Sequence, residues 1–72
     1  MAEYKRKTRE VIIRFLENRL SFPDCIAALD AALADLVPRL KHEELDDLRA
    51  VMMTNNEIVM KEMERRGQPG MR

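Results

Sequence analysis

The sequence lacks the features that stabilise very small secreted proteins, and it lacks those that mark membrane proteins. Its 72 residues include a single cysteine, Cys25, which excludes a disulfide framework. No apolar run approaches the roughly 20 residues that a membrane-spanning helix needs. One thiol together with six methionines fits a reducing compartment, so we expect a cytoplasmic protein without a membrane span.

An excess of charge of one sign is also missing. Thirteen Lys and Arg balance thirteen Asp and Glu, so no overall field favours nucleic acid or a membrane surface. Two glycines and three prolines, together with strong periodicity, argue against disorder. We predict one domain over 1–67 and a flexible tail over 68–72. A chain of this length buries only about 60% of its unfolded surface, which makes it marginally stable alone.

The most apolar stretch, Ser21–Leu40, is predicted to be a core helix covered by the other two. Ser21 and Asp24 form a capping-box-like pair, and Pro23 suits a first helical turn. Pro38 disfavours helix at the residue before it. The opposite face is rich in alanine, which helix propensity alone explains; close approach by another helix is the alternative. The apolar residues share one arc: Phe22, Ile26, Leu29, Leu33, Leu36, Val37 and Leu40.

Two charged amphipathic helices are predicted on either side, over Tyr4–Leu20 and His42–Arg66. The short connection at 21–24 predicts an antiparallel αα-hairpin. Acidic residues open the last helix and basic residues close it, as the helix dipole favours, and Gly67 suits the position after its end. The sequence therefore predicts an all-α, three-helix chain in which the long third helix projects beyond the hairpin.

The third helix has more apolar residues than one packing face requires. Two pairs of apolar residues flank the main apolar stripe of this helix: Val51 with Ile58 on one side, and Met53 with Met60 on the other. The members of each pair are seven residues apart, a spacing typical of coiled-coil packing. Asn56 is expected on the packed side, where a polar residue fixes register, although Asn55 beside it offers a competing explanation. We predict a dimeric bundle whose dimer or partner interface contains Val51, Met52, Met53, Asn56, Ile58, Val59, Met60 and Met63.

Residues with reactive side chains are few. Cys25 is predicted in the first turn of a helix, where the dipole lowers a thiol pKa, but no second cysteine or neighbouring histidine base accompanies it. His42 and Asp46 are one helical turn apart and could share a metal ion. Two ligands from one chain are too few for a zinc site.

Arg19 and Arg49 lie in apolar arcs. Snorkelling of the charged end into solvent is favoured for Arg19, near a helix end, and explains the mid-helix Arg49 less well. A buried pair with Asp24 or Asp35, or a small anion site, is the alternative. We predict no catalytic residues, no cofactor and no metal site.

A basic cluster near the N-terminus, Lys5, Arg6, Lys7 and Arg9, opposes the helix dipole. A simple solvated terminus is the favoured interpretation, because Glu3 and Glu10 interrupt the cluster; phosphate contacts are the alternative. The predicted function is a small homodimeric, non-catalytic interaction or regulatory module that binds itself and possibly another protein. The alternative is a nucleic-acid-binding regulator that uses this basic end.

Overall fold

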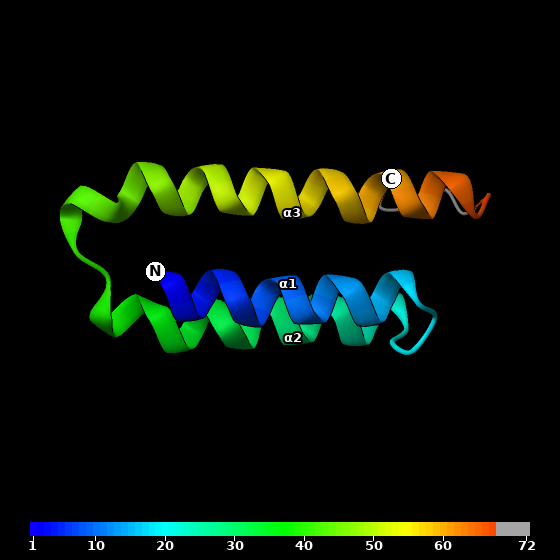
Figure 1. Ribbon diagram of the computed structural model, residues 1–72, viewed down its shortest axis with the longest axis horizontal. Coiled ribbons are helices and arrows are strands. Elements are labelled where there is room, and N and C mark those ends of the chain that lie inside the picture. The colour runs from blue at the N-terminus through cyan, green and yellow to red at the C-terminus, as the bar shows by residue number, and fades with distance from the viewer. Residues whose placement is uncertain (68–72) are drawn as a thin grey trace.

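The computed structural model describes residues 1–67, and the predicted tail 68–72 lies outside the described residues. It contains three α-helices: α1 (Ala2–Leu16), α2 (Phe22–Leu36) and α3 (Leu45–Arg65). Two short 3₁₀ helices, Val37–Arg39 and His42–Glu44, connect α2 to α3. The predicted all-α, three-helix fold is confirmed. The helices lie side by side, α1 and α3 running in one direction and α2 in the other (Figure 1).

The helix ends differ from the sequence prediction where the local backbone changes conformation. α1 ends at Leu16 rather than Leu20, because Asn18 takes a left-handed conformation with φ of 63°. Asparagine tolerates that region better than most residues, since its short polar side chain can hydrogen-bond locally. Ser21 caps α2 as predicted, its hydroxyl accepting from the Asp24 N–H at 3.3 Å; within 1–67 the reciprocal bond to the Asp24 side chain is not formed. Gly67, with φ of 77°, follows α3.

The third helix begins after a 3₁₀ turn. His42–Glu44 forms that turn, and the Glu44 carboxylate accepts from the Lys41 N–H at 2.9 Å, so an otherwise unpaired donor is satisfied. α3 then runs for 21 residues against 15 in α2. It extends past the α1–α2 turn, as the sequence predicted (Figure 1).

The helix at the centre of the core is α1, and the prediction that α2 fills this role is wrong. α1 has four buried side chains, Tyr4, Thr8, Ile12 and Phe15, whereas α2 has only Cys25 and Leu36. The backbones of both other helices approach α1 more closely than they approach each other.

Most of the predicted arc of α2 faces the core: Leu36 is buried, and Phe22, Leu29, Leu33 and Leu40 pack against it while partly exposed. Cys25 is fully buried, Ala32 is half-buried, and the predicted core residue Val37 is 55% exposed. The small residues Cys25 and Ala32 widen the contact face, and the larger residues of the arc other than Leu36 and Val37 are half-buried. Of the predicted alanine face, Ala27, Ala31 and Ala34 are exposed, whereas Ala28 and Ala32 are half-buried, so only part of this face is solvated.

Two hydrophobic clusters follow one another along the molecule. One contains Ile12, Phe15, Cys25, Val59 and Met63. The other contains Tyr4, Leu36 and Leu48. Each cluster includes buried residues of all three helices, so both contribute to holding the three helices together.

Candidate functional site

An open groove of about 480 Å³ runs between α1 and α3. Two contacts show that these helices are parallel neighbours. Near their starts, Lys5 Nζ lies 3.1 Å from Asp47 Oδ2; near their ends, Arg66 Nη2 donates to the Phe15 carbonyl at 2.8 Å. Because α2 covers the other side of α1, this side of the pair is left open. Its lining is Lys5, Thr8, Arg9, Ile12, Ile13, Leu16, Ala50, Val51, Thr54, Asn55 and Ile58.

The edges of the groove carry large apolar side chains that the monomer does not cover. Ile13 is 46% exposed and Leu16 41% on the α1 edge, and Ile58 is 37% exposed on the α3 edge. Single exposed apolar residues are ordinary, but a contiguous group around a groove is typical of a binding surface. The groove is therefore the strongest candidate site among the described residues.

The predicted interface residues of α3 are divided among different surroundings. Val59 and Met63 are buried in the core of the monomer, 2% and 5% exposed, so they are already used in packing within the chain. Val51 and Ile58 line the groove. Met52 is half-buried in the second cluster, Met60 is half-buried, and Met53 is 62% exposed. The eight residues do not share one surface.

The two neighbouring asparagines are placed opposite to expectation within the monomer. Asn55 is half-buried and lines the groove, whereas Asn56 is exposed. The expectation that Asn56 faces the packed side of α3 is wrong for this chain alone, because the buried face lies about one residue step away. Both asparagines border a second hollow of about 60 Å³ toward α2, with Tyr4 and Asp30.

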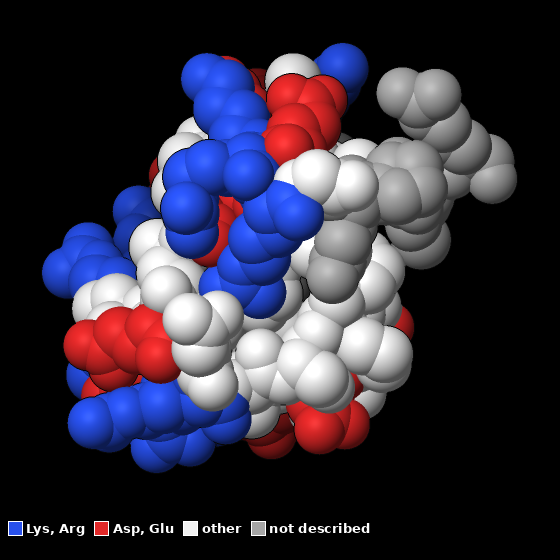
Figure 2. Space-filling model, turned by 90° about the vertical axis from the view of Figure 1, so that its right-hand side faces the viewer, with Lys and Arg blue, Asp and Glu red and all other residues white. Residues whose placement is uncertain are grey.

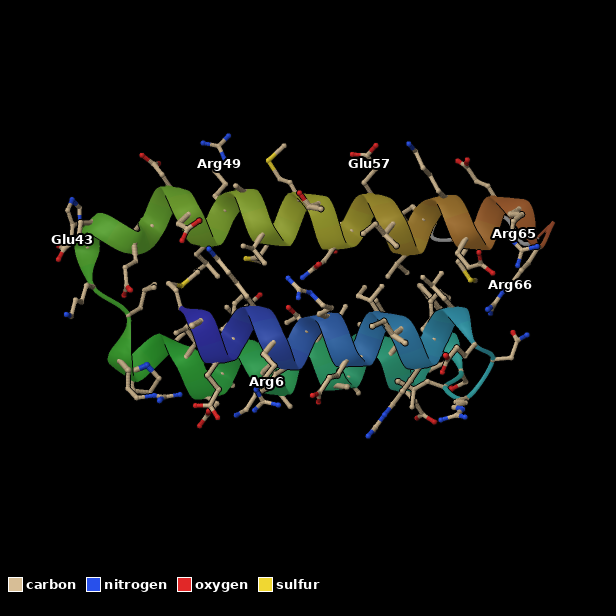
Figure 3. All side chains as sticks on the ribbon, in the orientation of Figure 1. Arg6, Glu43, Arg49, Glu57, Arg65 and Arg66 are labelled. Atoms are coloured by element: carbon tan, nitrogen blue, oxygen red, sulfur yellow. The ribbon has the colours of Figure 1, made fainter. Side chains whose placement is uncertain are left out.

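The basic cluster on α1 is largely engaged in ion pairs. Besides the Lys5–Asp47 pair, Lys7 Nζ donates to Asp35 Oδ2 at 3.1 Å, and this hydrogen bond is the main cause that lowers the Asp35 pKa. Arg6 donates to Glu10 at 3.0 Å and points away from α3 (Figure 3). Within residues 1–67, Arg9 has no ion pair. Ion pairs between helices thus account for Lys5 and Lys7, whereas Arg6 pairs within α1.

The remaining arginines noted in the sequence are exposed. Arg49 points away from the other two helices (Figure 3). Arg19 lies in the α1–α2 connection rather than in α1, with Nε 3.6 Å from a Glu17 carboxylate oxygen. Both side chains are exposed as a whole, so neither has the buried stem that the snorkelling interpretation requires.

Arg66, just after α3, makes three contacts, of which the sequence predicts one. The Glu62–Arg66 pair was expected from spacing, and Arg66 Nε donates to Glu62 at 2.7 Å. Arg66 also lies over the Phe15 ring, 4.6 Å from its centroid, besides binding the carbonyl of that residue. Long-range contacts of this kind leave no signal in helical periodicity.

Glu62 is buried beside two arginines. Arg65 Nε donates to it at 2.9 Å, and the Arg65 hydrogen bond is the largest cause that lowers the Glu62 pKa to about 2. Burial opposes this shift and Arg66 adds to it. Lys and Arg side chains gather at this end of the molecule, where α3 finishes beyond the α1–α2 turn (Figure 2). With Glu62 ionised, this cluster fastens the end of α3 to α1.

The chemically reactive residues have structural surroundings. Cys25 is fully buried as a free thiol, and burial raises its pKa, which disfavours the reactive thiolate. His42 is exposed in the 3₁₀ turn. In the part of the chain that the structure describes, no group of three or more His, Cys, Asp or Glu side chains is placed to hold a metal ion. No helix within 1–67 has both the length and the apolar character needed to cross a membrane.

Comparison of the chain with protein families, with curated proteins and with solved structures found no match.

Proposed function

We propose that the chain is a helical protein–protein interaction module, non-catalytic and cytoplasmic, that associates with a second copy of itself through the α1–α3 groove. The observation that carries this proposal is the group of exposed apolar side chains along the groove, Ile13, Leu16 and Ile58. Burial of such surface contributes roughly 25 cal/mol per Å² and is the main favourable term in association.

The size of the chain supports self-association. A domain below about 70–80 residues rarely obtains more than about 3–5 kcal/mol from one core, and oligomerisation is a common means of adding to it. Here the fully buried apolar residues form two small clusters. A second copy that covers the groove would extend the first cluster, since Ile12 belongs to both the cluster and the groove.

The test is light scattering coupled to size exclusion, on the native chain and on two matched variants. Ile58→Asp places a charge at the edge of the groove, whereas Val37→Asp places one at another exposed apolar residue, in the 3₁₀ helix after α2. We expect a native dimer at micromolar concentration that Ile58→Asp dissociates and Val37→Asp preserves. A native mass of 8.4 kDa at every concentration would contradict self-association.

A further inference from the structure

One face of α1 carries a row of three side chains with opposite charges at its ends, and the first two of them line the groove. Arg9, Ile13 and Glu17 follow one another at intervals of one helical turn, so they lie on the same face. Glu17 is the capping residue, and its N–H still donates to the Ile13 carbonyl at 2.9 Å, which continues the helical path. The row therefore reads basic, apolar, acidic along the outside of α1.

All three side chains of this row are available for a partner. Ile13 is 46% exposed, the Glu17 side chain is 53% exposed, and Arg9 is exposed. Arg9 has no ion pair within 1–67, and Glu17 meets only Arg19, at 3.6 Å. Arg9 is thus unpaired within 1–67, whereas Glu17 would exchange an exposed ion pair with Arg19 for one with the partner.

A row of this kind is complementary to itself when it is reversed. If two copies meet with their α1 helices antiparallel and a two-fold axis at Ile13, the two Ile13 side chains meet on the axis. Arg9 of each copy then faces Glu17 of the other, and the same contact occurs twice, as two-fold symmetry requires. A parallel arrangement would place Arg9 beside Arg9, where like charges repel.

We infer that the second copy docks with its α1 antiparallel to α1 in the groove, in the register that pairs Arg9 with Glu17. This inference rests on the proposed self-association and specifies its geometry. The apolar edges of the groove, Ile13 and Leu16 on α1 and Ile58 on α3, supply the affinity. The two charge pairs fix direction and register, since exposed ion pairs contribute more to specificity than to affinity.

Charge exchange provides the test. Arg9→Glu gives a row with two acidic ends, and Glu17→Arg gives one with two basic ends. Each variant alone should associate about ten-fold more weakly than the native chain, because two attractive pairs become repulsive. An equimolar mixture of the two should form a heterodimer of native strength, and the double variant should recover homodimerisation. Arg49→Glu, on the exposed outer face of α3, is the matched control and should change nothing.

Dissociation constants from sedimentation equilibrium, with helicity checked by circular dichroism, separate the outcomes. Recovery of native-strength dimerisation in the mixture supports the antiparallel register. This conclusion stands even if either variant is less stable by itself. A native dimer that is insensitive to both substitutions would overturn the register while leaving the proposed function in place. A native monomer would overturn the proposed self-association, and this geometry with it.

Discussion

Replacing Arg66 with methionine should destabilise the chain far more than the same change at its neighbour Arg65. Arg66 lies over the Phe15 ring and donates to the Phe15 carbonyl, whereas the side chain of Arg65 is 68% exposed and binds only Glu62. A cation over an aromatic face is worth about 0.5–2 kcal/mol. A hydrogen bond from a charged donor adds about 1.5–3 kcal/mol.

Methionine keeps the apolar stem and removes the charge and the donors, so we expect a loss of about 2 kcal/mol. For a domain of this size each kcal/mol moves the Tm by about 4–8 °C, which gives a decrease of about 8–16 °C. Thermal unfolding followed by circular dichroism at pH 7 and fixed protein concentration measures it, because self-association makes Tm depend on concentration. Equal decreases for Arg66→Met and Arg65→Met would refute the argument, since only the shared contact with Glu62 would then matter.

The low pKa of Glu62, about 2 against an ordinary value of 4.5, predicts that its contribution to stability is complete above pH 4.5 and is lost as the pH falls toward 2. Glu62→Gln should lower Tm at pH 7 and flatten the decline of Tm between these two pH values; an unchanged slope would contradict the assignment. Because Lys5, Arg6 and Lys7 are in ion pairs, we expect no measurable binding of DNA or RNA at about 50 mM salt. Salt-sensitive binding that disappears when these three and Arg9 are all changed to alanine would instead favour phosphate recognition.

Helical periodicity was sufficient to predict the number, order and approximate extent of the helices. Ser21 and the residues around it identified the start of α2 because capping is a local interaction. The end of α1 was predicted four residues too late, since the apolar spacing continues through Leu20 although the backbone turns at Asn18.

Relative burial was not predictable from periodicity. The pattern gives each helix an apolar arc but does not say which helix lies between the others, and the small residues Cys25 and Ala32 widen the contact face of α2. One step of 100° separates Asn55 from Asn56, so a modest rotation of the contact face exchanges their positions. Ile13 and Ile58 line the same groove although they are far apart in the chain, and no local sequence pattern predicts that they are close in space.

The central position of α1 has a consequence for the order in which the chain opens. Contacts between α1 and α2 span a short connection, whereas α3 meets α1 only after the whole hairpin has been traversed. Closing the shorter loop costs less conformational entropy, so the hairpin is expected to form first and α3 to dock last. Partial opening then releases α3 as a unit, and the hydrogen-bonded amide protons in the middle of α1 are expected to exchange more slowly than those of α3.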